Sequence, residues 1–273
     1  MRIVHFIPSL RLAQGGIVRH VIDLANLLSG IGVSVVLVTF DDQDAPDDWI
    51  RERESDSLSK PCIVKIPRTR LPRLGPVTRR RIRELLVWAD VLHLHGVWPP
   101  EHLWLARIAS RLGTPTVLMA HGTLDDWAIR QKGVKKRLYL RLFGRRMLRR
   151  CATVLCATGE EHRQAARNLP GIPMQIVPGI LDLSPFEEPR QSELVAQHWD
   201  SFAQGSRETP RVLFLSRFHH KKGIETLVDS AAILRDQGRP IRVLIVGSGE
   251  TEYTRQLRSR IEDHGLGNFV RRH

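Results

Sequence analysis

Short apolar runs alternate with amphipathic stretches along the first 177 residues. Seven of these runs have the length of a buried strand, and they occupy residues 3–7, 33–39, 62–66, 91–95, 116–120, 153–157 and 175–177. Strands that are apolar along their whole length are typical of a parallel sheet with both faces covered. The alternation therefore predicts an α/β fold with a doubly wound, Rossmann-like sheet.

The alternation of strand and helix patterns is interrupted once along the chain. Residues 178–209 are rich in proline, glycine and polar side chains, and strand and helix patterns resume from residue 210. We therefore expect an amino-terminal Rossmann-like domain over residues 1–177, a linker over 178–209 and a second α/β domain over 210–273. The length of 273 residues suits two such domains.

Composition narrows the choice of partners. Lys and Arg number 42 against 29 Asp and Glu, and the resulting net charge of +13 favours phosphates, acidic polymers or anionic membranes as partners. Cys62, Cys151 and Cys156 lack metal-ligand spacing and predict small core residues in a reducing compartment. The first residues lead straight into a strand, and no apolar run is long enough to cross a bilayer. We expect a cytoplasmic protein.

Glycine and histidine residues follow several predicted strands. Gly15-Gly16 lies between the first strand and the first helix, where it is either a ligand loop or a simple turn, because the GxGxxG pattern is absent. His93 and His95 alternate on one strand, but further ligands with suitable spacing are not evident, so we expect no metal there. His121 follows another strand, at the end where α/β sheets bind ligands, and there it contacts a substrate or only caps the strand.

Cations and glycines gather in a similar position in the second domain. Arg217, Lys221 and Lys222 stand between a predicted strand and a helix, where side-chain charge and free helix amides suit a diphosphate. The next strand opens into a turn at residues 247–249 with glycine at both ends, which allows close backbone approach.

A strongly basic stretch covers residues 130–150, with ten Lys or Arg among 21 residues. Apolar residues interleave with the cations at helical spacing. Such a helix, from 132 to 150, suits either an anionic membrane surface or ordinary packing with a solvated basic face. Nucleic acid binding is disfavoured, because no helix-turn-helix, zinc-finger or RNA-binding signature accompanies the charge.

Several motifs stand in the order of a known family. The chain reads GGIVRHVIDLANLLSGIGVSVVLVT, DVLHLHGVW, MAHGTLDDWAIRQKGVKKRLY, LCATGEEHR, IVPGI, LFLSRFHHKKGIETLVDSAAIL and VLIVGSGE. Together they resemble the nucleotide-sugar glycosyltransferases of the GT-B fold, most closely the retaining glycosyltransferase family 4. The resemblance covers nearly the whole chain.

The resemblance implies roles for these residues. His121 would contact the transferred sugar as the catalytic residue, and a nucleotide-sugar would be the donor. The donor-binding residues that it implies are Gly15, Gly16, Arg217, Lys222, Gly247 and Gly249. Because fixed cations can stabilise the departing diphosphate, no metal or other cofactor is required. The acceptor would be a glycan or a lipid-linked molecule in cell-surface polysaccharide or glycolipid synthesis, at the inner membrane face.

One departure from the family pattern is large. Family members carry a Glu-x7-Glu motif beyond the glycine turn, whereas no Glu here is followed by another Glu eight positions later. We therefore expect the second domain to be truncated and transfer activity to be weak or absent. Alternatives are a non-catalytic relic that binds phosphate or sugar, and a phosphate- or dinucleotide-binding α/β protein, which the missing GxGxxG pattern disfavours.

Overall fold

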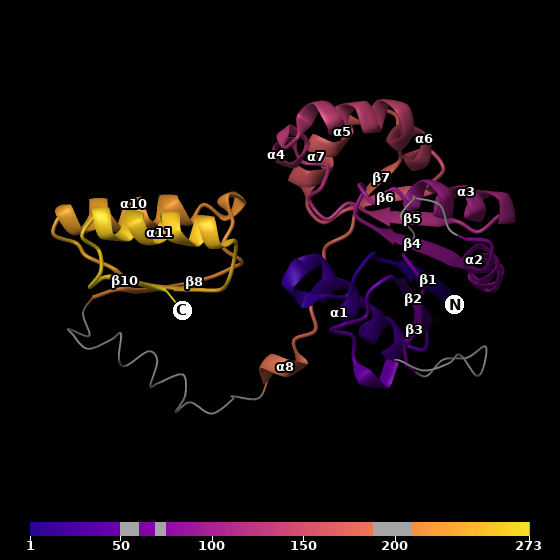
Figure 1. Ribbon diagram of the computed structural model, residues 1–273, viewed down its shortest axis with the longest axis horizontal. Coiled ribbons are helices and arrows are strands. Elements are labelled where there is room, and N and C mark those ends of the chain that lie inside the picture. Colours follow the sequence, from indigo (N-terminus) through magenta and orange to yellow (C-terminus); the bar gives the residue numbers. More distant parts are fainter. Residues whose placement is uncertain (50–59, 69–74, 188–208, 273) are drawn as a thin grey trace. The chain divides into compact units, whose positions relative to one another are not determined.

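The computed structural model describes residues 1–49, 60–68, 75–187 and 209–272. Its contacts divide the chain into two compact units, Met1–Leu183 and Ser184–His273, coloured from indigo to orange and from orange to yellow in Figure 1. The start of the predicted linker, residues 178–183, belongs to the first unit, and residues 188–208 lie outside the described residues. Each unit contains its own parallel sheet.

The first unit is built on seven strands that all run parallel, on the runs that the sequence predicts. They are β1 (Arg2–Phe6), β2 (Ser34–Thr39), β3 (Cys62–Lys65), β4 (Val91–His95), β5 (Thr116–Met119), β6 (Thr153–Cys156) and β7 (Met174–Ile176). Their order in the sheet is β3-β2-β1-β4-β5-β6-β7. The order reverses between β1 and β4, and α/β folds bind ligands outside the carboxyl ends of the strands at such a switch point.

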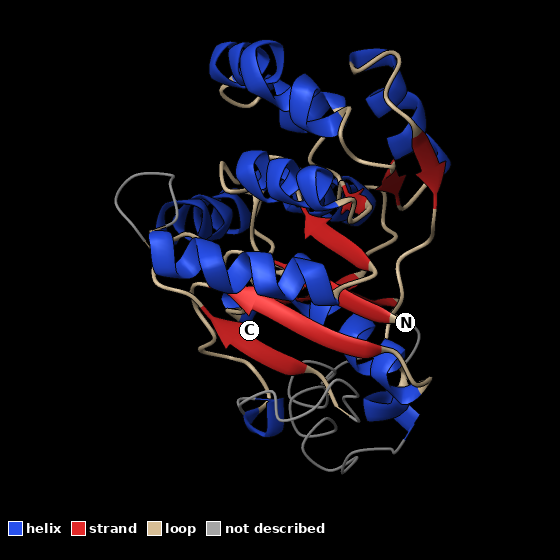
Figure 2. Ribbon diagram, turned by 90° about the vertical axis from the view of Figure 1, so that its right-hand side faces the viewer, coloured by secondary structure: helices blue, strands red, loops and turns tan. Residues whose placement is uncertain are grey.

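Alternate residues of β1, β2 and β3 serve two separate cores. On β1, Val4 and Phe6 belong to the core under α2 (Pro76–Trp88), α3 (His102–Leu112) and α6 (Arg145–Leu148), whereas Ile3 belongs to the core under α1 (Gly16–Gly30). The unit also contains the short α4 (Asp126–Arg130) and α7 (Gly159–Asn168). Figure 2 distinguishes the helices, in blue, from the strands, in red. Helices on both faces explain why these strands are largely apolar.

The basic stretch forms a helical segment with an irregular centre. α5 (Gly133–Tyr139), a π-helical turn η3 (Leu140–Gly144) and α6 follow one another without a gap. Leu140, Met147 and Leu148 are buried in the core, so one side of the segment packs on the unit. The predicted helix over 132–150 is therefore present, but the sequence pattern did not reveal its π turn.

The second unit has a three-stranded parallel sheet in the order β10-β9-β8. The strands are β8 (Arg211–Leu215), β9 (Arg242–Val246) and β10 (Val270–Arg272), and the helices between them are α10 (Ile224–Asp236) and α11 (Thr251–Asp263). Both helices lie on the same side of this sheet in Figure 1. On β8, Leu213 and Leu215 are correspondingly exposed, whereas Val212 and Phe214 pack against the core.

Two further expectations concern the whole chain. Cys62, Cys151 and Cys156 are buried and form no disulfide in the described residues, and burial raises the pKa of the Cys151 thiol to about 12. They are therefore small core residues, as predicted.

Among the described residues, no helix combines the length and the apolar character that a bilayer crossing demands.

Candidate functional site

The loop that carries Gly15 and Gly16 is fixed by the acidic loop after β2. Arg11 pairs with the Asp41 carboxylate, and the Leu12 amide donates to Oδ2 of Asp44 over 2.7 Å. Gly15 has φ 98° and ψ −159°, a conformation that is open almost only to glycine. The loop is thus held from outside while its glycine allows the sharp entry into α1.

The first turn of α1 is open to an anion. No side chain caps this helix, and its first turn contains no acidic residue. In the part of the chain that the structure describes, no atom outside the glycine's own neighbours lies within 4 Å of the position that a Cβ on Gly16 would take, so there is open space beside this residue. Free amides and the helix dipole then both favour negative charge.

Five histidines gather beside this loop, at the switch point of the sheet. His5 comes from β1, His93 and His95 come from β4, His121 follows β5, and His20 lies on α1. Because His5 and His93 are register partners on neighbouring parallel strands, their side chains emerge on the same face of the sheet. The ring of His20 meets that of His121 edge-on, with centroids 5.0 Å apart, which connects α1 to the cluster.

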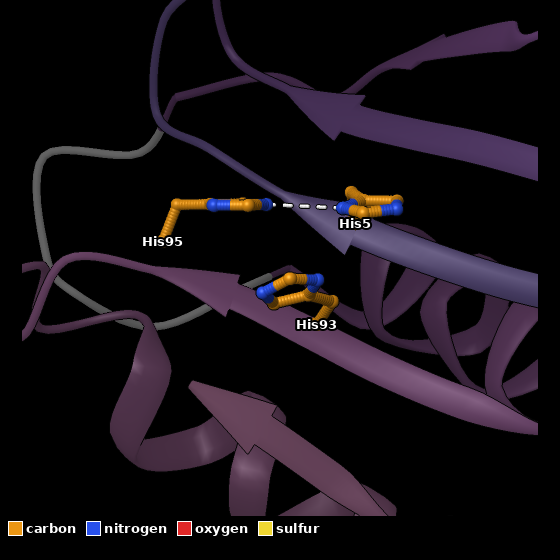
Figure 3. A group of neighbouring side chains, drawn as sticks. All are labelled: His5, His93 and His95. Carbon is orange, nitrogen blue, oxygen red and sulfur yellow. Dashed lines mark hydrogen bonds between the residues drawn. The ribbon is translucent and has the colours of Figure 1, made fainter. Parts of the chain in front are cut away.

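Three of these rings form a hydrogen-bonded series. His5 Nδ1 lies 3.0 Å from Nε2 of His95 (Figure 3), and His95 Nδ1 lies 3.0 Å from Nε2 of His121. His93 stacks on His95 with centroids 4.3 Å apart. Burial first, and neighbouring histidines second, lower the pKa of His5 and of His121 to about 3, and lower the pKa of His95 well below its ordinary value. The imidazoles are therefore neutral at physiological pH.

The same rings are the group in the described residues that comes nearest to a metal site. One nitrogen each from His5, His93 and His95 lies within 4.8 Å of the others. No carboxylate or thiol joins this group, and two of its members already bind each other by a hydrogen bond. The arrangement suits neutral imidazoles that satisfy one another, and the expectation that no metal is required stays a prediction.

His121 sits in a tight turn of unusual backbone conformation. Its φ is 54° and that of Gly122 is 68°, as the two central residues of a type I′ turn require, and the Thr123 amide donates to the Ala120 carbonyl over 3.1 Å. Histidine at positive φ is uncommon, so its surroundings must hold it there.

A buried carboxylate holds this turn. Glu161 of α7 is 7% exposed, and its two oxygens accept from the backbone amides of Gly122 and of Ala157, the latter over 2.7 Å. The turn after β5 is thereby tied to the end of β6. The motif Thr158-x-x-Glu161 resembles a helix capping box, and the Thr158 hydroxyl does accept from the Glu161 amide over 3.1 Å. The glutamate itself reaches across to the neighbouring turn instead, which the sequence alone did not reveal.

In the second unit, the cationic loop predicted for the diphosphate and the glycine turn predicted for donor binding lie side by side. The Ser216 amide donates to the Val246 carbonyl over 3.1 Å, and the Phe218 amide donates to the Ser248 carbonyl over 2.7 Å. Arg217 stands between these two bonds and is exposed, and Lys222 ends the short helical turn before α10. The loop 216–222 therefore meets the turn 247–249 at the carboxyl ends of β8 and β9.

Steric crowding explains why glycine occupies both ends of that turn. A Cβ on Gly247 would lie 1.9 Å from the Ser216 carbonyl oxygen, and one on Gly249 would lie 2.2 Å from that of Phe218. Close approach of the two loops therefore demands glycine at both positions, independently of any ligand. The structure groups Gly15, Gly16 and His121 in the first unit, and Arg217, Lys222, Gly247 and Gly249 in the second.

Comparison with known families decides the classification. A family model described as Glycosyltransferase Family 4 matches residues 14–184, more than half of the 273 residues. The chain belongs to glycosyltransferase family 4. A second model, described as Glycosyl transferases group 1, matches residues 198–272 of this family 4 chain. With the α/β architecture, these matches confirm the GT-B fold class that the sequence predicts.

Relatives of this family 4 chain are distant in sequence. The phosphatidyl-myo-inositol mannosyltransferases of Mycobacterium tuberculosis and Mycobacterium bovis are 24% identical over 272 residues, which cover 97% of this chain and 65% of each relative. The chain thus spans less than two thirds of their length.

Solved structures share the fold. Anabaena HepE in complex with UDP and glucose matches all of this chain and 68% of its own, with a TM-score of 0.67 and 15% identity. WaaG, a glycosyltransferase involved in lipopolysaccharide biosynthesis, matches 99% of this chain and 69% of its own, with a TM-score of 0.62 and 14% identity.

We predict that Gly247→Ala destabilises the second unit by about 1–3 kcal/mol, because the new methyl group collides with the backbone of Ser216. Gly267→Ala in the same unit is the control, since none of the described residues beyond its chain neighbours has an atom within 4 Å of its Cβ position. Urea titration followed at the NMR signals of β8 and β9 measures both variants. Equal midpoints for the two variants would contradict the crowding.

Glu161→Gln is expected to loosen the His121 turn, because an amide side chain offers one acceptor where two backbone amides need one each. The expected loss is about 1.5–3 kcal/mol of local stability. Hydrogen exchange at the Gly122 and Ala157 amides measures it. Glu160→Gln on the exposed side of the same helix is the control. It should change the local opening free energy that these exchange rates report by less than about 0.5 kcal/mol. Similar exchange in both variants would remove the clamp role of Glu161.

Proposed function

We propose that the chain transfers a sugar from a nucleoside diphosphate sugar to a glycan or lipid-linked acceptor, as a retaining family 4 glycosyltransferase in cell-surface polysaccharide or glycolipid synthesis. One observation carries the proposal. In a chain of this family, the loop with Arg217 and Lys222 packs against the turn 247–249, where two strands end and α10 begins. Two compared proteins support the proposal. The mycobacterial phosphatidyl-myo-inositol mannosyltransferase is similar in sequence, and Anabaena HepE in complex with UDP-glucose is similar in fold.

The chemistry of the leaving group suits these residues. Departure of a nucleoside diphosphate builds negative charge on phosphate oxygens, and cations already in place stabilise that charge in the transition state. Arg217 and Lys222 supply the cations, and the start of α1 at Gly15 and Gly16, which no side chain caps, supplies a second anion-binding element. With charge compensated in this way, the reaction proceeds without a metal ion.

His121 is the proposed contact to the transferred sugar. It is held in a fixed turn, and its low pKa keeps it uncharged, so it offers hydrogen bonds to hydroxyl groups and not a positive charge. We assign no catalytic nucleophile.

We expect Arg217→Ala and Lys222→Ala each to weaken binding of UDP, GDP or ADP by about 1.5–3 kcal/mol, the value of a charge-assisted hydrogen bond. Isothermal titration at constant salt measures the affinities. Arg258→Ala, on the exposed side of α11, is the control for a simple loss of positive charge. Equal affinities in the Arg217, Lys222 and Arg258 variants would refute a diphosphate site.

A second candidate is a binding protein without transfer activity, because the cations and glycines of the two loops account for binding and by themselves supply no chemical step. The same titration separates the two, when combined with a turnover assay. Nucleotide binding with release of nucleoside diphosphate from a sugar donor supports the transferase. Binding of nucleotide or sugar with no turnover of any donor would support the relic.

The basic segment 132–150 is the proposed membrane contact, on the cytoplasmic side where lipid-linked acceptors would lie. It borders a groove of about 1410 Å³ whose lining includes one acid, Asp126, and seven arginines, namely Arg130, Arg137, Arg141, Arg145, Arg146, Arg149 and Arg167. Beside them, Leu138, Leu142 and Phe143 are each more than half exposed. Cations next to exposed apolar side chains are the combination that binds an anionic bilayer surface.

Reversing two charges in this segment, Arg141→Glu with Arg146→Glu, should weaken sedimentation with acidic liposomes at least tenfold, because each cation near the surface contributes about 1 kcal/mol. Arg81→Glu with Arg83→Glu on α2 changes the net charge equally and should have a smaller effect. High salt should release the unmodified protein as well. If the unmodified protein does not bind the liposomes at low salt, the membrane contact is refuted and the segment is an ordinary packed helix with a solvated basic face.

A further inference from the structure

The series of three histidines imposes a condition on where their protons lie. Two hydrogen bonds connect His5 to His95 and His95 to His121, each 3.0 Å long between ring nitrogens. Every such bond needs one proton between its two nitrogens, and a neutral imidazole carries only one proton. Because burial keeps all three rings neutral, the position of one proton determines the other two.

Only two arrangements satisfy both bonds. In the inward arrangement, His121 donates from Nε2 to His95, His95 donates to His5, and the proton of His5 is on Nε2. In the outward arrangement, His5 donates from Nδ1, His95 donates from Nδ1, and Nε2 of His121 accepts. The proton of His121 is then on Nδ1, the nitrogen that faces away from the series.

The buried end of the series decides between them. Nε2 of His5 is inaccessible and has no hydrogen-bond partner among the described residues, and the residue is wholly buried. The inward arrangement would place an N–H group there without an acceptor, and buried N–H groups without acceptors are among the rarest features of folded proteins. The outward arrangement leaves only an unprotonated nitrogen at that position.

We infer that His5 and His95 are positioning residues that fix the proton of His121 on Nδ1, so that His121 presents a hydrogen-bond donor to a hydroxyl oxygen of the bound sugar. The sugar in this statement rests on the proposed function, whereas the position of the proton does not. His121 then acts as a donor and not as a general base, because its Nε2 lone pair is occupied by His95. Its neighbour His20 meets the ring of His121 edge-on and makes none of the ring-to-ring hydrogen bonds of the series among the described residues.

Nitrogen-15 NMR of the full chain tests the inference directly, because protonated and unprotonated imidazole nitrogens have well separated chemical shifts. The His121 signals are assigned by their loss in His121→Asn. We expect an unprotonated Nε2 and a protonated Nδ1, unchanged between pH 5.5 and pH 8, conditions set to bracket the ordinary pKa of histidine, about 6.5. A protonated Nε2 on His121, or titration of its ring within that range, would overturn the inference.

Two substitutions at His95 separate positioning from packing. In His95→Asn, the side-chain amide lies about where Nδ1 of His95 was and can still donate a hydrogen bond to His121. In His95→Gln, the amide lies about where Nε2 was, so it can bond only with His5. We expect His121 to keep its Nδ1 proton in the Asn variant and to shift toward the Nε2 form in the Gln variant. His264→Gln in the second unit is the control and should leave the His121 signals unchanged. If His95 only packs, the tautomer of His121 will be the same in all three variants, and the inference fails.

Activity and metal binding give independent readouts. With a nucleotide-sugar donor, His95→Gln should lower turnover by about 10- to 100-fold with little change in UDP affinity, and His95→Asn should recover part of the loss. Absence of turnover in the unmodified chain would contradict the proposed function and leave the NMR result standing. Addition of Zn²⁺ should not move the signals of His5 or His93, and metal-bound shifts at both would show a metal site in place of the proton series.

Discussion

The parallel direction of the strands is the constraint on which the first unit depends. Because every strand runs the same way, the chain leaves all of them at one edge, and the reversal of strand order between β1 and β4 opens a position there. The glycine loop, the start of α1 and the turn with His121 meet at this edge although they are far apart in sequence. Buried imidazoles fill the space between them, and burial keeps these rings uncharged.

Long-range polar contacts then hold the loops at this edge in fixed positions. The acidic loop after β2 anchors the residues before Gly15 through Asp41 and Asp44. Glu161, from the helix after β6, anchors the turn after β5. In each case a carboxylate on one strand-to-strand connection accepts hydrogen bonds from backbone or charged donors of the neighbouring connection. Such contacts suit a site whose loops must keep uncommon backbone angles.

The sequence predicted most of the fold and part of the site. Apolar runs located all seven strands of the first unit, because a strand covered on both faces needs apolar residues at most positions. The turn at 247–249 and the loop after β8 were also predicted, since glycines and cations after a strand are local signals. Glu161 and His5 were missed, because their partners depend on which strands become neighbours. His5 did leave one signal, a titratable residue inside an otherwise apolar run.

The π turn between α5 and α6 has a consequence for the phase of that helical segment. Arg137, Arg141, Arg145 and Arg149 recur at intervals of four, and all of them line the same groove. In an unbroken α-helix, four residues advance by about 400°, so the last of these arginines would point about 120° away from the first. A π turn adds about one residue without advancing the helix, which reduces that divergence to about 20°. One irregular turn thus converts a drifting series of cations into a straight row along the helix axis.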